Sequence, residues 1–231
     1  MKREILDAIN EARAGKRAVA LITSLEDGSQ RVFDPLEAAP PEDVELARAL
    51  ADVLASDRSR SVVTGDGEVF LQVFNPPLRL VVVGAVHITQ VLAPMAVLTG
   101  YQVTVVDPRR SFAAEDRFPG VDLRTDWPDE AMQALAPDAR TAIVTLTHDP
   151  KIDDPALHEA LRSRAFYIGC LGSPRTHASR LERLRESGFG DDDLARIHGP
   201  IGLAIGARSP EEISLSILAQ ITTRLRGGRV T

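Results

Sequence analysis

The chain has 231 residues, of which 44% are hydrophobic, and its formal net charge at pH 7 is −6. This composition supports a folded core and excludes global disorder, and the acidic balance argues against a general nucleic-acid binder, which presents a basic face. Cys170 is the only cysteine, which excludes an intrachain disulfide, and no apolar run reaches ~18 residues, the length that a membrane-spanning helix needs. The N-terminus lacks the apolar core of a signal peptide, so we expect a cytoplasmic protein that contacts no membrane.

The first 76 residues predict a small α+β region. Helical periodicity predicts helices over residues 2–14 and 42–55, and short β-type runs predict strands at 18–23, 30–33 and a hairpin over 61–74. The run Asn75-Pro76-Pro77 then interrupts regular structure. We therefore expect two domains, residues 1–76 and 77–231.

From residue 78 onward, short apolar runs alternate with helical patterns, which predicts an α/β fold with a Rossmann-like parallel sheet. The expected strands are 78–83, 102–106, 141–146 and 165–169, and the expected helices are 88–99, 129–136, 155–163, 174–187 and 210–226. Three helix starts place a capping side chain before a proline, namely Asp154-Pro155, Ser173-Pro174 and Ser209-Pro210.

The first strand of this region runs into the turn Gly84-Ala85-Val86-His87 and then into a helix. Such a β-turn-α unit holds nucleotide-like ligands, because the backbone amides at the helix start attract an anion. Gly84 and Ala85 are candidate binding residues through this turn, and His87 can point a polar side chain into the site. Val86 stands where G-x-G-x-x-G has its second glycine, so ordinary dinucleotide binding is in doubt. A turn that merely packs a helix on the sheet is the alternative.

Asp107 follows the next strand, at the position that accepts hydrogen bonds from a ribose or another diol. Arg109 beside it can neutralise a phosphate or hold a carboxylate through two bonds. The pair Asp107-Pro108 also suits a plain turn.

The turn Gly172-Ser173-Pro174-Arg175-Thr176 predicts a second phosphate site, since small residues expose amides and Arg175 and Thr176 add donors at a helix start. Three further arginines of that helix are expected on a solvated face with Glu182 and Glu186 close by, namely Arg180, Arg183 and Arg185.

Three histidines accompany these strand ends or lie in a loop nearby, namely His87, His148 and His198. His148 and Asp149 can act in proton transfer or ligate a metal carried by the ligand, although a turn with a capping aspartate explains them equally well. His198 and Gly202 fall in a glycine-proline loop unlike a core position, which favours a role in the site. Cys170 is expected to be a buried structural thiol.

Five ordered runs carry a family resemblance: VVGAVH at 82–87, VVDPR at 105–109, LTHDP at 146–150, YIGCLGSPRT at 167–176 and HGPIGL at 198–203. Through them, residues 78–226 closely resemble the Rossmann domain of the XdhC/CoxI family, which are accessory proteins of molybdenum hydroxylases such as xanthine dehydrogenase and carbon monoxide dehydrogenase. The family often has glycine where Val86 stands. Many longer members also carry an N-terminal domain with Gly-Ser-x-Pro-Arg and Gly-Gly-Cys motifs that residues 1–76 lack, so the chain resembles a short form.

The resemblance implies a chaperone, rather than a turnover enzyme, that binds the molybdenum cofactor (Mo-molybdopterin) and delivers it to an apo-hydroxylase, often after sulfuration with a cysteine desulfurase. We expect the cofactor to lie among the segments at Gly84, Asp107, His148, Gly172 and His198. Arg109 and Arg175 would meet phosphate and Asp107 the polar edges of the ligand. The N-terminal region would support docking to the target enzyme or a homodimer.

Two alternatives stay open at this point. An NAD(P)-dependent oxidoreductase would use the β-turn-α start and Asp107 for a dinucleotide. A non-catalytic interaction module would bind a partner protein and no ligand, and its polar strand ends would tolerate alanine.

Overall fold

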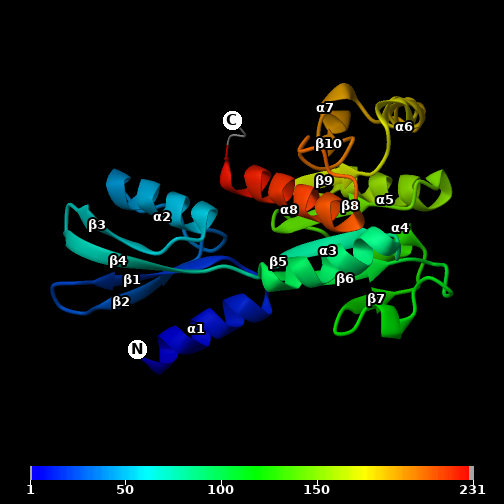
Figure 1. Cartoon of the computed structure of the whole chain (residues 1–231). Coiled ribbons are helices and arrows are strands. Elements are labelled where there is room, and N and C mark those ends of the chain that lie inside the picture. The colour runs from blue at the N-terminus through cyan, green and yellow to red at the C-terminus, as the bar shows by residue number, and fades with distance from the viewer. Residues whose placement is uncertain (1, 229–231) are drawn as a thin grey trace. The chain divides into compact units, whose positions relative to one another are not determined.

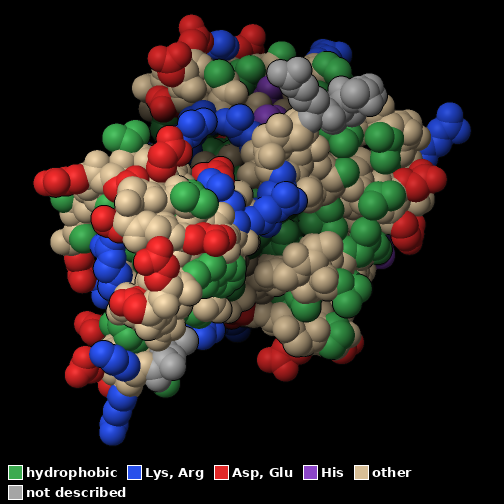
Figure 2. Space-filling model, turned by 90° about the vertical axis from the view of Figure 1, so that its left-hand side faces the viewer, with side chains coloured by type: hydrophobic (Ala, Val, Ile, Leu, Met, Phe, Trp, Pro, Cys, Tyr) green, Lys and Arg blue, Asp and Glu red, His purple; other side chains and the backbone are tan. Residues whose placement is uncertain are grey.

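The computed structural model describes residues 2–228, which divide into two compact units, Met1–Pro76 and Pro77–Thr231 (Figure 1). Among these residues no helix combines the length and the apolar character needed to cross a membrane. On the face seen in Figure 2, acidic and basic side chains are interspersed.

The N-terminal unit is a four-stranded antiparallel sheet with two helices. The sheet order is β2-β1-β4-β3, formed by β1 (Val19–Ser24), β2 (Gln30–Phe33), β3 (Arg60–Thr64) and β4 (Gly67–Phe74). Helix α2 (Val44–Ser56) packs Leu46, Leu50 and Val53 against the sheet, and α1 (Arg3–Ala14) contacts β2. The expected α+β region is therefore confirmed.

The second unit has a six-stranded parallel sheet of order β10-β9-β8-β5-β6-β7. Its strands are β5 (Leu78–Val83), β6 (Tyr101–Val106), β7 (Asp122–Arg124), β8 (Thr141–Thr145), β9 (Tyr167–Cys170) and β10 (Ile197–His198). The first strand, β5, lies between β6 and β8, so the order reverses direction there. Such a switch point opens a crevice at the carboxyl ends of the strands, where α/β proteins bind ligands.

Helices cover both faces of this sheet. They are α3 (His87–Leu98), α4 (Pro128–Leu135), α5 (Pro150–Arg162), α6 (Pro174–Glu186), α7 (Asp191–Leu194) and α8 (Pro210–Arg226), with a 3-10 turn η1 at Glu115–Arg117. Alternate residues of β5 point to opposite faces: Leu80 and Val82 join the core under α3 and α8, and Val81 and Val83 join the core under α4 and α5. Double coverage explains why these strands read as continuous apolar runs, and it confirms the predicted α/β Rossmann-like fold.

Two edge strands escaped prediction. β7 and β10 have three and two residues, too few to show a β-type alternation. His198, expected in a loop, is therefore the last residue of β10 and pairs with Gly169 of β9.

The expected start of α5 at Asp154-Pro155 is wrong. The helix begins at Pro150, and Asp149 caps it by accepting a hydrogen bond from the Lys151 amide at 3.0 Å. Pro155 lies inside the helix, where it lacks an N–H to donate to the preceding turn. The fully buried side chains of Ala156 and Leu157 stabilise the helix against that loss. The other two predicted starts hold: Ser173 caps α6, and Ser209 forms a capping box with Glu212 on α8.

Candidate functional site

Gly84 directly follows β5 at the switch point and has a positive φ of 117°. A Cβ on this residue would lie 2.7 Å from Cγ2 of Thr147 and 3.3 Å from its backbone nitrogen. The turn therefore needs glycine both for its backbone conformation and for the close approach of the loop after β8. This contact joins the ends of β5 and β8, as the sequence predicted for two strand ends of one sheet edge.

Asp107 is fully buried at the end of β6 and has all its hydrogen bonds within the protein. Its carboxylate accepts from the Ala85 amide at 2.8 Å, from the Arg109 amide at 3.0 Å, and from Nε and Nη2 of Arg109 at 2.9 and 2.7 Å. This corrects the expectation that Asp107 meets polar edges of a ligand: the side chain clamps the Gly84 turn to Arg109. Burial by itself would raise the pKa of Asp107, but the hydrogen bonds from Arg109 and Ala85 outweigh it and hold that pKa below its usual range.

Arg109 has its guanidinium in this ion pair and lies 4.3 Å from the centroid of the Phe112 ring. The neighbouring hollow, of about 460 Å³, is lined by Val86, His87, Ser111, Phe112 and Arg117. His87 is exposed there, with Nδ1 3.2 Å from Oε1 of Gln90. The Gly84 turn thus lies beside a hollow that has Phe112 and Arg117 in its walls.

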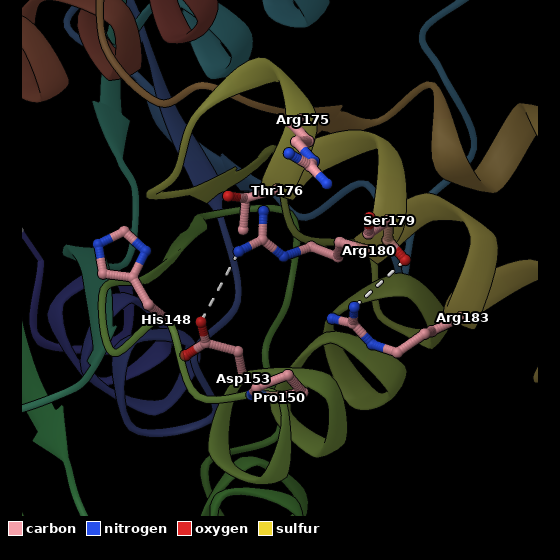
Figure 3. A pocket seen from close by; sticks show the side chains of 8 residues that line it. All are labelled: His148, Pro150, Asp153, Arg175, Thr176, Ser179, Arg180 and Arg183. Atoms are coloured by element: carbon pink, nitrogen blue, oxygen red, sulfur yellow. Dashed lines mark hydrogen bonds and ion pairs between the residues drawn. The ribbon is translucent and has the colours of Figure 1, made fainter.

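A second hollow lies at the ends of β8 and β9 and has a volume of about 260 Å³. We call it the arginine pocket. It is lined by His148, Pro150, Asp153, Arg175, Thr176, Ser179, Arg180 and Arg183 (Figure 3). Of the residues predicted from sequence, it brings together His148, Arg175 and Thr176. Asp149, the neighbour of His148, uses its carboxylate to cap α5.

Arg180 occupies the middle of the arginine pocket, between Asp153 and Thr176 (Figure 3). Its residue exposure is only 2%, which corrects the prediction of a solvated arginine. Nη2 donates to the Leu171 carbonyl at 2.9 Å and lies 3.8 Å from Oδ2 of Asp153. Nε and Nη1 are buried, and neither has a hydrogen-bond partner among the described residues.

Asp153 is the acidic member of the pocket and is 1% exposed. Its Oδ1 accepts from the Thr147 hydroxyl at 2.7 Å, whereas Oδ2 has no hydrogen-bond partner in residues 2–228. Burial raises the pKa of this carboxyl above its usual range, against the opposing effects of Thr147 and Arg180. Thr147 also packs against Gly84, so one side chain contacts both Asp153 and the Gly84 turn.

The other two arginines lie nearer the surface. Arg183 is only half-buried, and it pairs with Asp154 through bonds of 2.6 and 3.0 Å. Arg175 is exposed and makes no hydrogen bond or ion pair with any described residue. The signal that could have identified Arg180 is its spacing: it lies four residues before the fully buried Leu184, on the same stripe of α6.

The turn before α6 is capped by Ser173, as predicted. Gly172 has φ 148°, and a Cβ there would lie 3.2 Å from Cβ of Thr176 and 3.9 Å from Nη1 of Arg180. Ser173 accepts from the Thr176 amide at 3.1 Å as the helix cap. Glycine thus leaves the space beside Arg180 open.

His198 and Gly202 do not join either hollow. The His198 ring stacks on Tyr167 with centroids 4.8 Å apart, and the Gly202 amide donates to Oε1 of Gln220 in α8 at 2.9 Å. Burial lowers the pKa of His198, and Arg224 adds to that effect. Their contacts are with the sheet edge and α8, which separates them from the predicted shared site.

Within residues 2–228, no cluster of three or more His, Cys, Asp or Glu side chains could hold a metal ion. Cys170 is fully buried, and burial raises its pKa to about 11. The arginine side chains and helix starts of this sheet edge are groups that can hold an anion.

Comparison with known proteins identifies the domain. The sequence model of the XdhC Rossmann domain matches residues 80–221. The molybdenum cofactor insertion chaperone PaoD of Escherichia coli K12 is 31% identical over 150 residues, which cover 65% of this chain and 41% of PaoD. A Bacillus subtilis 168 protein, named as a probable component of xanthine dehydrogenase, is 33% identical over 153 residues, 66% of this chain and 44% of that protein. The chain thus spans less than half the length of these relatives.

A solved structure shares the fold. The crystal structure of a xanthine dehydrogenase from Bacillus halodurans superposes with a TM-score of 0.69 at 24% identity, covering 98% of this chain and 65% of the other.

Proposed function

Because this chain belongs to the XdhC Rossmann-domain family, we propose that it binds the molybdenum cofactor and delivers it to an apo-enzyme of the molybdenum hydroxylase class, of the xanthine dehydrogenase or carbon monoxide dehydrogenase type. The observation that carries the proposal is the similarity to PaoD, named as a molybdenum cofactor insertion chaperone, over 65% of this chain. On this proposal the protein is a cytoplasmic insertion factor and not a turnover enzyme.

The chemistry of the sheet edge supports a large anionic cargo. Molybdopterin combines a phosphate, a flat pterin and a metal-dithiolene head, so it needs cationic donors at one end and a broad wall at the other. The arginine pocket offers the first, and the hollow beside Phe112 and Arg117 offers the second. The contact between Gly84 and Thr147 connects the two regions.

The dinucleotide alternative is less well supported. The carboxylate of Asp107 already accepts hydrogen bonds from Ala85 and Arg109, so it is not free to accept them from a ribose. Val86 is the residue before the first turn of α3, where the dinucleotide pattern has glycine. Calorimetry with NAD and NADP should accordingly detect weak binding or none.

The direct test is cofactor retention. We expect the full chain, purified from a host that makes the cofactor, to carry a pterin that becomes fluorescent after oxidation, and to activate an apo-hydroxylase when mixed with it. The same protein from a host without the cofactor pathway is the control. Equal, background fluorescence in both preparations would contradict the proposal.

Partner docking follows as a second part of the proposal. We propose that the apo-hydroxylase is the main partner and that the N-terminal unit supports docking or a homodimer. Association with a cysteine desulfurase is the further expectation. Pull-down assays test binding to the apo-hydroxylase and to the desulfurase, and light scattering of the protein alone tests for a homodimer.

A further inference from the structure

The floor of the arginine pocket holds a charge that the protein itself leaves incompletely bonded. Arg180 is 2% exposed, yet only its Nη2 donates a hydrogen bond, to Leu171, while Nε and Nη1 have no partner among the described residues. Asp153 is 3.8 Å from Nη2, which is an ion pair without a hydrogen bond. Burying a guanidinium with unpaired N–H groups destabilises the folded protein, and an anion that accepts a hydrogen bond from Nη1 would offset that loss.

The walls of the pocket supply further donors. Arg175 at the rim has no ion pair within residues 2–228, and the hydroxyl-bearing residues Thr176 and Ser179 also line the hollow. Helix α6 has Ser173 as its cap, and the first-turn residues Arg175 and Thr176 line the hollow, near the positive end of the helix dipole. Gly172 keeps the space beside Nη1 of Arg180 free of a side chain.

The charge and shape of these donors favour a tetrahedral oxyanion. Arg183 is neutralised by Asp154, and Arg180 is partly neutralised by Asp153, which leaves Arg175 as the excess positive charge. The donor side chains all come from α6, and they occupy different positions around the hollow, with Arg175 above Thr176 and Arg180 (Figure 3). A flat carboxylate uses one planar fork, whereas a phosphate accepts bonds from several directions.

We propose that the arginine pocket is the subsite for the phosphate group of the bound ligand, a phosphate monoester or pyrophosphate, with Arg180 as the buried anchor and Arg175 as the cation at the rim. This inference rests on the proposed function for the identity of the ligand. It moves the phosphate away from the Gly84 turn and from Arg109, whose guanidinium is paired with Asp107. The pterin-bearing part would then extend from the pocket past Thr147 toward the Gly84 turn.

The test uses the full chain with inorganic pyrophosphate and inorganic phosphate as probes, in a buffer free of other oxyanions. Calorimetry should show that Arg175→Ala weakens pyrophosphate binding by about tenfold, the loss of one charge-assisted contact. Arg185→Ala is the matched control, because Arg185 lies on the same helix but is exposed and pairs with Asp191 outside the pocket. This control should bind as the unmodified chain does.

Two further measurements make the inference falsifiable. Arg180→Lys keeps a cation, so its thermal unfolding reports whether the fold survives, and its pyrophosphate affinity should fall in a folded protein. A crystal soaked with pyrophosphate should place an oxygen within hydrogen-bond distance of Nη1 of Arg180. An anion seated elsewhere, or equal weakening by Arg175→Ala and Arg185→Ala, would overturn the inference.

Cofactor retention separates this inference from the proposed function. Retained pterin in Arg175→Ala, with pyrophosphate affinity unchanged, overturns the subsite and leaves the chaperone proposal standing. Pyrophosphate binding that needs Arg175, in a protein that never carries pterin, supports the subsite and contradicts the chaperone proposal.

Discussion

Two buried charged side chains at one sheet edge differ in how completely the protein bonds them. Asp107 accepts four hydrogen bonds from Ala85 and Arg109, whereas Arg180 leaves Nε and Nη1 without partners in the described chain. A fully bonded buried charge stabilises one arrangement of the backbone, while an incompletely bonded one is a reason to look for a ligand. Asp107 therefore supports the Gly84 turn, and Arg180 is the side chain that we propose as part of the binding surface.

We expect Asp107→Asn to lower the free energy of unfolding at pH 7 by roughly 2–3 kcal/mol, because an amide cannot accept all the bonds that Arg109 donates and buried donors are left unpaired. Urea titration measures this. The folded-state pKa of Asp107 is depressed, so its contribution is present above about pH 4 and is lost as the pH falls below that. The difference between the two proteins should accordingly shrink in acid, and a constant difference from pH 7 to pH 3 would contradict this role.

Cys170 should be unreactive in the folded protein. It is fully buried, and burial raises its pKa to about 11, so almost no accessible thiolate exists at neutral pH. We expect a thiol reagent to label it at pH 8 only after denaturation, with one thiol per chain released in guanidinium as the control. Rapid labelling of the native protein would contradict this expectation.

At the scale of the elements, helix starts position the pocket. α5 begins at Pro150 and α6 at Pro174, each with a capping side chain on the residue before the proline. These two starts place His148, Asp153 and Arg175 at the hollow. The first turns of α5 and α6 thus build the site as much as the strands do.

Removal of the α5 cap should lower the free energy of unfolding by the amount typical of capping residues. We expect Asp149→Ala to destabilise the protein by about 1 kcal/mol, since the Lys151 amide loses its acceptor. Thermal or urea unfolding measures the change. Asp116→Ala, at an exposed aspartate in η1, is the control and should change stability by much less. Equal effects of the two substitutions would argue against the cap.

At the scale of the whole molecule, each unit has its own core. The sheet of Pro77–Thr231 is covered on both faces by helices of the same unit, and the sheet of Met1–Pro76 packs on α2. A unit of about 150 residues buries enough surface to fold alone, whereas one near 60–80 residues is marginal.

We therefore expect residues 77–231, produced alone, to unfold in one cooperative thermal transition and to keep the circular dichroism of an α/β domain. Residues 1–76 alone should melt at a lower temperature. A 77–231 fragment without a cooperative transition would show that the two units depend on each other for folding.

The sequence alone determined the class of the fold and the turns of its sheet edge. Apolar runs such as 78–83 and 141–146, with caps such as Ser173 and Ser209, act over a few residues, so local propensity predicts them. One local signal was misleading, because Asp154-Pro155 resembled a helix start. Strands β7 and β10 were missed because they are too short to show a pattern.

Only the tertiary structure decided which buried polar groups are fully hydrogen-bonded within the protein and which are not. The carboxylate of Asp107 is bonded to an amide 22 positions earlier in the chain, and Arg180 contacts Leu171 and Asp153, which lie outside α6. Such contacts form when distant segments pack, and the free energy of burying a charge depends on all its neighbours at once. The spacing of residues along the chain therefore does not predict the neighbours of a buried charge.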